Sequence, residues 1–155
     1  MATSAVDGVF LDTNVLVYAM VAEAPFHQMA RTAIEDLYDS GVELWVSRQV
    51  LREYLATLTR PQTFARPQPA SVLAADVRHF QARLRVGDEG RAVTERLLAL
   101  VEQFAVGGKQ VHDANIVATM EVHGIRRLLT ANPGDFTRFA HLITVQTLPA
   151  TQVGP

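Results

Sequence analysis

The sequence predicts an α/β fold built as a three-layer α/β/α sandwich, with a central, mostly parallel sheet between two layers of helices. Short apolar runs with the length of strands alternate along the chain with segments whose apolar residues recur at helical spacing. This alternation is typical of parallel sheets, because two parallel strands must be joined by a crossover that usually contains a helix. The chain has 155 residues and no internal repeat, which predicts one domain over residues 1–155.

The first expected strand ends in polar residues. The apolar run over residues 9–11 is too short for a buried helix, and Asp12, Thr13 and Asn14 follow it directly. Ligands and reactive groups gather beyond the carboxyl ends of parallel strands, so Asp12 is the first candidate for a functional residue. The alternative is that Asp12 or Thr13 only caps the helix that follows.

The remaining elements follow from periodicity, caps and turn residues. Helical spacing of apolar residues predicts helices from residue 15 to near Pro25, over 26–40, from a cap at Ser47 to Arg60, over 71–80, from Asp88 or Glu89 to Phe104 and over 111–120. Short apolar runs predict further strands over 42–46, 83–86, 127–130 and 143–147, before a polar tail from Pro149. Turn residues predict a turn over 132–135, and an exposed proline-rich loop over 60–69 that is a candidate to face a substrate or a partner.

Composition excludes several kinds of site. The chain has no cysteine, which rules out a disulfide framework, a thiolate zinc site and a cysteine nucleophile. No apolar run approaches the roughly 20 residues that cross a membrane, and the N-terminal segment lacks the parts of a secretory signal, so we expect a cytoplasmic protein with no membrane partner. The net charge of −2 does not indicate a nucleic-acid partner, but nearly all the positive charge is arginine, whose planar fork suits phosphate.

Three more acidic residues are candidates for the same edge of the sheet, one after a strand and two within the first two turns of helices that can begin near that edge. Glu53 borders the buried stripe of its helix, and Asp113 lies on the buried stripe at the N-terminal end of another. Asp135 follows the strand over 127–130, in a polar turn. Each has a simpler alternative: a surface ion pair for Glu53, a favourable contact with the helix dipole for Asp113, and a cap on a short helix from Phe136 for Asp135.

Four carboxylates at one edge of a sheet would require a cation. Two unpaired like charges about 4 Å apart cost roughly 4 kcal/mol at an effective dielectric constant near 20, so such a group protonates or spreads apart unless a cation joins it. Carboxylate ligands without cysteine favour Mg²⁺, with Mn²⁺ as a substitute, and water activated by such an ion can attack a phosphodiester. The chain has no glycine-rich phosphate loop, no Gly-x-Ser-x-Gly and no His-Glu-x-x-His, so the usual signatures of other hydrolases are absent.

Four short blocks carry these acids and span nearly the whole chain: Leu11-Asp12-Thr13-Asn14-Val15-Leu16, Gln49-Val50-Leu51-Arg52-Glu53-Tyr54, Val111-His112-Asp113-Ala114-Asn115-Ile116-Val117-Ala118, and Leu129-Thr130-Ala131-Asn132 with Asp135-Phe136. Together, and in this order, they resemble the PIN-domain ribonucleases, specifically the VapC-like toxins of bacterial toxin-antitoxin systems. The resemblance implies a PIN-like fold and a Mg²⁺-dependent endoribonuclease that cleaves cellular RNA.

The same resemblance implies roles for individual residues. The set that would carry catalysis and hold one or two Mg²⁺ or Mn²⁺ ions comprises Asp12, Glu53, Asp113 and Asp135. The residues that would support this set are Thr13, Asn14, Thr130 and Asn132. Some members of the family carry an acid at the position of Asn132, so the fourth carboxylate of this chain rests on Asp135 alone. The resemblance also implies a homodimer, and a cognate antitoxin whose tail reaches the acidic groove.

Four arginines in and after the helix that bears Glu53 are candidates to steer RNA phosphates: Arg48, Arg52, Arg60 and Arg66. Two other functions remain open. One is a phosphatase with Asp12 as covalent nucleophile, although Asn14 stands where that chemistry commonly needs a second acid. The other is a non-catalytic RNA- or protein-binding module on the same fold.

Overall fold

The computed structural model describes residues 7–148, and its centre is a sheet of five strands. The strand order is β3-β2-β1-β4-β5, and every pair of neighbours is parallel, which confirms the predicted α/β class. The strands are β1 (Gly8–Leu11), β2 (Glu43–Ser47), β3 (Arg85–Gly87), β4 (Arg127–Thr130) and β5 (Thr144–Thr147). Because all strands run the same way, their carboxyl ends meet at one edge of the sheet.

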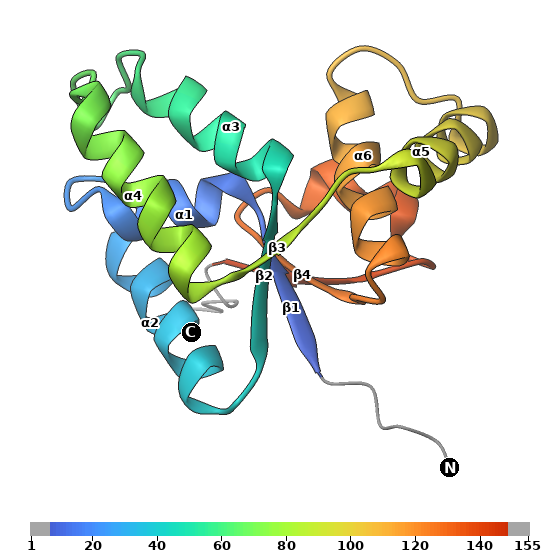
Figure 1. Cartoon of the computed structure of the whole chain (residues 1–155), viewed down its shortest axis with the longest axis horizontal. Coiled ribbons are helices and arrows are strands. Elements are labelled where there is room, and N and C mark those ends of the chain that lie inside the picture. Colours follow the sequence, from blue (N-terminus) through green and yellow to red (C-terminus); the bar gives the residue numbers. More distant parts are fainter. Residues whose placement is uncertain (1–6, 149–155) are drawn as a thin grey trace, which may run out of the picture.

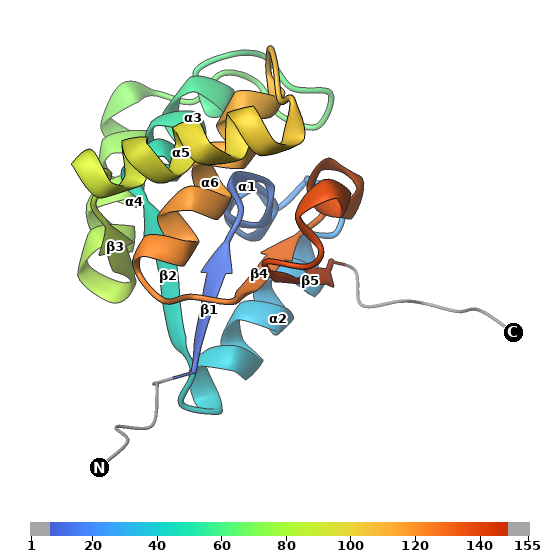
Figure 2. The same ribbon diagram turned by 90° about the vertical axis from the view of Figure 1, so that its right-hand side faces the viewer.

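Helices cover both faces of this sheet, which confirms the three predicted layers (Figure 1). One layer contains α1 (Thr13–Met20), α2 (His27–Asp39), α3 (Arg48–Leu58) and α4 (Ala70–Arg83). The other contains α5 (Arg91–Phe104), α6 (Gln110–Val122) and the short 3-10 helix η1 (Pro133–Phe139). Turned by 90°, the molecule shows α5 and α6 side by side in front of the sheet (Figure 2).

The boundary between α4 and β3 differs from the sequence-based expectation. The helix continues to Arg83, so the strand occupies residues 85–87 instead of 83–86. Gly87 ends the strand against the ring of His123, and a Cβ at Gly87 would lie 3.1 Å from that ring. The pairing of β3 with β2 and this close approach are tertiary contacts, which local periodicity does not contain.

The start of α5 also differs from the expectation. The helix begins at Arg91, and the two acids expected to open it, Asp88 and Glu89, lie in the preceding loop. Both acids instead accept hydrogen bonds from the start of α3: Asp88 from the Arg48 side chain and Glu89 from the backbone N–H of Gln49. A negatively charged carboxylate at the N-terminus of a helix stabilises that helix. Here the two acids stabilise α3, and not α5, which they were expected to begin.

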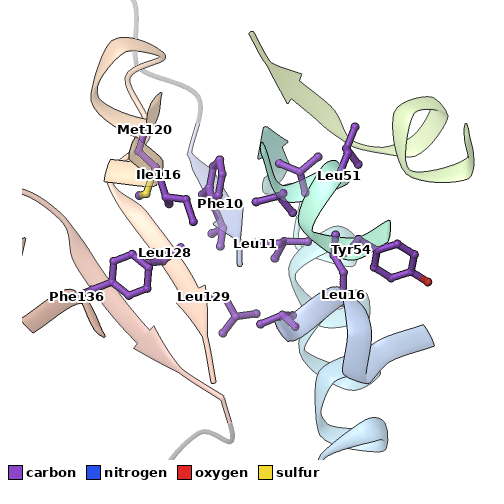
Figure 3. Packing of buried hydrophobic residues seen from close by; sticks show 14 of the residues in the cluster. Phe10, Leu11, Leu16, Leu51, Tyr54, Ile116, Met120, Leu128, Leu129 and Phe136 are labelled. Atoms are coloured by element: carbon purple, nitrogen blue, oxygen red, sulfur yellow. The ribbon is translucent and has the colours of Figure 1, made fainter. Parts of the chain in front are cut away.

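The core packs against both faces of β1. Successive strand residues point to opposite faces, so Phe10 lies beside Ile116 of α6, while Leu11 points toward Leu16 of α1 (Figure 3). Each of these side chains is at most 2% exposed. Tyr54 on α3 is also fully buried, and its hydroxyl donates to Asp76 on α4 at 2.7 Å. This packing fixes the end of β1, from which the candidate site begins.

The proline-rich stretch over 60–69 is a largely exposed loop between α3 and α4, as predicted. Its centre is compact: Gln62 and Ala65 exchange backbone hydrogen bonds of 2.8 and 3.3 Å, and the Gln62 side chain donates to the carbonyl of Thr57. Within residues 7–148, no helix has the length and apolar character to span a membrane. The polar tail from Pro149 and the segment over residues 1–6 lie outside the described residues.

Candidate active site

Asp12 lies directly after β1 and caps α1. Its Oδ1 accepts a hydrogen bond of 2.8 Å from the backbone N–H of Thr13, and its Oδ2 accepts one of 2.8 Å from the Thr130 hydroxyl. The amide of Asn14 lies 3.4 Å from the same Oδ2. Asp12 is only 8% exposed. It is therefore the helix cap that the sequence offered as an alternative, and its carboxylate also lines the cleft described below.

Thr130 and Asn14 hold the end of β4 against the end of β1. The Thr130 hydroxyl donates to Asp12 and accepts a hydrogen bond of 3.0 Å from the backbone N–H of Asn132. The Asn14 side-chain oxygen accepts one of 3.1 Å from the backbone N–H of Ala131. Of the four residues expected to support the acids, Asn14 and Thr130 thus contact Asp12 through their side chains. Thr13 and Asn132 contribute backbone N–H groups, to Asp12 and to Thr130 respectively.

Glu53 projects from α3, which begins with the predicted Ser47 cap. Both of its carboxylate oxygens accept hydrogen bonds: Oε2 from the Thr13 hydroxyl at 2.7 Å, and Oε1 from the Gln49 side-chain amide at 2.6 Å. In the part of the chain that the structure describes, Glu53 belongs to no ion pair. The surface ion pair weighed as its simpler role is therefore not formed.

The other two acids come from the second helical layer. Asp113 lies in the first turn of α6 and is half-buried, whereas Asp135 lies in the first turn of η1 and is exposed. The short helix begins at Pro133, a favoured first helical residue, and not at Phe136. Asp135 is therefore inside this helix, and no side-chain cap bond forms at its start.

All four acids line one cleft with a volume of about 400 Å³, here called the acidic cleft. Thr13, Asn14 and Asn132 line it too, while Thr130 is buried. The four carboxylates come from four separate segments: the end of β1, α3, α6 and η1. A larger cavity of about 810 Å³ lies among α1, α2 and α4 but is lined by none of the four acids. The acidic residues that line the smaller cleft, and not the volume of either cavity, therefore identify the candidate site.

One of the four arginines considered for RNA phosphates lines the acidic cleft. That residue is Arg60, two residues after α3 ends at Leu58. Arg48 and Arg52 instead form ion pairs with the two acids of the loop before α5, at 3.1 and 3.9 Å. Arg66 is exposed and does not line the cleft.

Burial and mutual repulsion raise the pKa values of two of the acids. Desolvation raises the pKa of Asp12 to about 6, although the hydrogen bond from Thr130 partly counters it. Desolvation also raises the pKa of Asp113 to about 7, with a further rise caused first by the charge of Asp135 and a partial offset from Arg138. The carboxylates of the cleft therefore repel one another, and a cation among them would stabilise their ionised forms.

The donor set of the acidic cleft fits a hard divalent cation. The acids offer only carboxylate oxygens, which are the ligands that Mg²⁺ and Mn²⁺ prefer. In the observed arrangement, no three Asp, Glu or His side chains among residues 7–148 lie close enough to hold one ion together. Mg²⁺ is commonly held by one or two carboxylates and completes its shell with water, so three converging ligands are not required.

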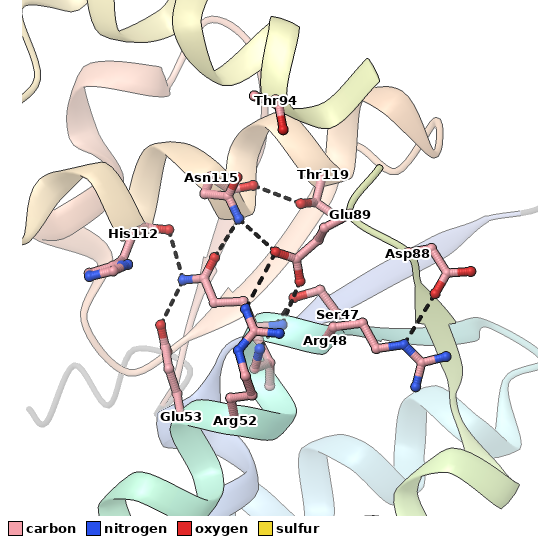
Figure 4. Close-up of polar contacts among 12 residues, drawn as sticks. Ser47, Arg48, Arg52, Glu53, Asp88, Glu89, Thr94, His112, Asn115 and Thr119 are labelled. Carbon is pink, nitrogen blue, oxygen red and sulfur yellow. Dashed lines mark hydrogen bonds and ion pairs between the residues drawn. The ribbon is translucent and has the colours of Figure 1, made fainter. Parts of the chain in front are cut away.

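Sequence reasoning assigned no role to three polar residues beside this cleft, Gln49, Glu89 and Asn115. They form a connected group of hydrogen bonds that ends on Glu53 (Figure 4). Gln49 lies four residues before Glu53, a spacing that places two side chains on one helix face and could have indicated the contact. No comparable sequence signal connects Glu89 or Asn115 to α3.

Comparison with known proteins identifies the family. The PIN domain family matches residues 9–142. Ribonuclease VapC48 of Mycobacterium tuberculosis is 29% identical over 133 residues, which are 83% of this chain and 89% of that protein. VapBC2 of Rickettsia felis, solved with a promoter DNA fragment, has a TM-score of 0.65 at 20% identity, over 90% of this chain and 98% of that one. Mycobacterium tuberculosis VapC20, a toxin that cleaves the sarcin-ricin loop, has a TM-score of 0.59 at 20% identity, over 77% and 86%. The chain belongs to the PIN domain family and is similar to the VapC toxins within it.

Proposed function

We propose that the protein is a Mg²⁺-dependent endoribonuclease that acts as the toxin of a toxin-antitoxin pair and cleaves cellular RNA. The observation that carries this proposal is that four carboxylates from distant segments line one cleft in a chain of the PIN domain family. A curated relative named as a ribonuclease covers most of the chain, which supports the same activity. Because the substrate would be cellular RNA, the proposed location is the cytoplasm.

The proposed roles follow from how each acid is held. Asp12, Glu53, Asp113 and Asp135 would hold Mg²⁺, with Mn²⁺ as a substitute. A bound ion of this kind supplies an activated water and stabilises the charge on the leaving oxygen of a phosphodiester. Asp12 and Glu53 are oriented in advance by hydrogen bonds from the protein, so they would hold the cation with little rearrangement.

Arg60 is the arginine best placed to meet the RNA backbone. It lines the acidic cleft from the start of the loop after α3, and its guanidinium can donate to phosphate oxygens. The three other arginines remain weaker candidates, because two of them are paired with acids of the protein and none lines the cleft.

The proposed partners are an antitoxin and a second copy of the chain. Several structural neighbours are complexes named as VapBC or toxin-antitoxin pairs, which supports the antitoxin; the homodimer rests on the resemblance to VapC toxins. Light scattering after size-exclusion chromatography tests the dimer: a mass of two chains is expected, and a mass of one chain at micromolar concentration would contradict it.

The activity is tested by incubating the purified protein with total bacterial RNA, in Mg²⁺ and in EDTA. The variants Asp12→Asn and Asp113→Asn keep the side-chain size but remove a charge, and Asp36→Asn on α2 is a matched control outside the acidic cleft. We expect cleavage that requires Mg²⁺, falls by roughly a hundredfold or more in the two cleft variants, and is unchanged in the control.

The same experiment separates the alternatives. Equal cleavage by all variants would assign the activity to a contaminating nuclease. Hydrolysis of p-nitrophenyl phosphate without any cleavage of RNA would favour the phosphatase with an Asp12 nucleophile. RNA or antitoxin binding without any hydrolysis would favour the non-catalytic module.

A further inference from the structure

We propose that Gln49 is a positioning residue that sets the spacing between Glu53 and Asp113, and thereby selects a small divalent cation in the acidic cleft. The inference rests on the proposed function, because it concerns the carboxylates proposed to hold the ion. Gln49 is only 5% exposed and lies in the first turn of α3, one turn before Glu53. It does not line the cleft, so it would act through its neighbours.

The side-chain amide of Gln49 joins two helices that carry acids. Its Nε2 donates to Glu53 at 2.6 Å and to the backbone carbonyl of His112 at 3.0 Å, while its Oε1 accepts from Asn115 at 2.7 Å (Figure 4). His112 and Asn115 flank Asp113 on α6. A single side chain thus holds Glu53 directly, and holds the segment of α6 from which Asp113 projects.

The orientation of this amide is determined by chemistry as well as by shape. Glu89 can only accept, and its carboxylate accepts from the Asn115 side-chain amide at 2.9 Å. The same Asn115 nitrogen donates to Gln49, so the atom of Gln49 that faces it must be the oxygen. The nitrogen of Gln49 is consequently directed at Glu53 and His112, and both of its hydrogens are used.

Glu89 strengthens this group of hydrogen bonds because its carboxylate accepts from both Gln49 and Asn115. It accepts a hydrogen bond from the backbone N–H of Gln49, where its negative charge lies at the N-terminus of α3. Its side chain is only 16% exposed. Hydrogen bonds to ionised groups are stronger than neutral ones, so the carboxylate of Glu89 anchors both Gln49 and Asn115.

Fixed spacing matters for the choice of ion. Mg²⁺ requires nearly ideal octahedral geometry at short distances, whereas Ca²⁺ accepts longer and more irregular arrangements. Loss of the Gln49 amide would let Glu53 and α6 shift relative to each other. The effect should therefore be greater on Mg²⁺ than on Ca²⁺, a difference that a purely structural role of Gln49 would not produce.

The test measures the dissociation constants of Mg²⁺ and Ca²⁺ by calorimetry in wild type, Gln49→Met and Asn115→Leu. Gln81→Met is the matched control, because Gln81 is an exposed glutamine on α4 whose side chain accepts a hydrogen bond from Arg48 and has no other side-chain hydrogen bond within residues 7–148. We expect Gln49→Met to weaken Mg²⁺ binding about 10- to 100-fold, as is usual for residues that orient metal ligands, and Ca²⁺ binding distinctly less. Asn115→Leu should act in the same direction, since it releases the amide of Gln49.

Thermal unfolding of the metal-free variants accompanies the titrations. Unchanged binding of both ions in folded Gln49→Met and Asn115→Leu would overturn the inference while leaving the proposed function intact. An equal loss of Mg²⁺ and Ca²⁺ affinity with a lowered Tm would also overturn it, because Gln49 would then serve stability alone. Failure of the wild type to bind Mg²⁺ would overturn the proposed function itself.

Discussion

At the scale of single residues, the Thr130 hydroxyl connects the fold to the candidate site. It is fully buried, donates to Asp12 and accepts from the backbone N–H of Asn132. Thr130→Val keeps the shape of the side chain but leaves the Asp12 carboxylate and the Asn132 N–H without this hydrogen-bond partner. We therefore expect the free energy of unfolding to fall by about 1–3 kcal/mol. The pKa of Asp12 should also rise further, because one hydrogen bond that stabilises its charge is lost.

Urea denaturation measures the first effect, and carboxyl carbon NMR measures the second. Thr130→Ser is the control, since it retains the hydroxyl and should keep the pKa of Asp12 near that of the wild type. A Thr130→Val variant with the stability and the Asp12 pKa of the wild type would show that this hydroxyl does not hold the carboxylate.

The raised pKa values of Asp12 and Asp113 make stability depend on pH. Both lie above the ordinary value of 3.8, at about 6 and about 7, so the folded protein binds protons more tightly than the unfolded chain. The stability they contribute is fully present below about pH 4 and is lost as the pH rises through 6 and 7. Protons and a cation compete for the same carboxylates, so we expect Mg²⁺ to raise Tm more at pH 8 than at pH 5. Thermal unfolding with and without Mg²⁺ at both pH values measures this, and equal shifts would contradict it.

At the scale of elements, the two ends of α3 present arginines to different parts of the molecule. Arg60, just beyond the C-terminal end of α3, lines the acidic cleft, while Arg48 at the start of α3 is bound to Asp88 and Gln81. We expect Arg60→Gln to raise the KM for RNA about tenfold or more, the loss of about one charge-assisted contact, and Arg48→Gln to leave it nearly unchanged. Steady-state cleavage of one defined RNA measures both, and a larger effect from Arg48 would place the RNA on the other side of α3.

The same elements show what the sequence could predict. Strands, their parallel direction and most helices follow from periodicity and caps such as Ser47. The predicted start of α5 was wrong, because Asp88 and Glu89 bind the N-terminal end of α3 and do not begin α5. The parallel strands that end at one edge bring Asp12 and Asp135 together, whereas Glu53 and Asp113 reach the cleft from the helices α3 and α6. The contacts among Gln49, Glu89 and Asn115 join segments 26 to 66 residues apart, so no local pattern contains them.

At the scale of the whole molecule, charge should link cation and RNA binding. The net charge is −2, and four carboxylates line the cleft to which the proposed function would bring the RNA phosphate. Without a cation these charges repel phosphate, so we expect a labelled, non-hydrolysable RNA analogue to bind the wild-type protein more tightly in Mg²⁺ than in EDTA at equal ionic strength. Fluorescence anisotropy measures the two affinities. Equal or weaker binding in Mg²⁺ would show that RNA is held away from the acidic cleft.

Locating a bound ion in the acidic cleft would test the proposal that its four acids bind a divalent cation. Crystals grown with Mn²⁺ and measured near the manganese absorption edge would show the ion by its anomalous scattering. We expect a peak in the acidic cleft within coordination distance of Asp12 or Asp113, and no peak there in crystals of Asp12→Asn. A peak only elsewhere on the protein, or none at millimolar Mn²⁺, would contradict the proposal.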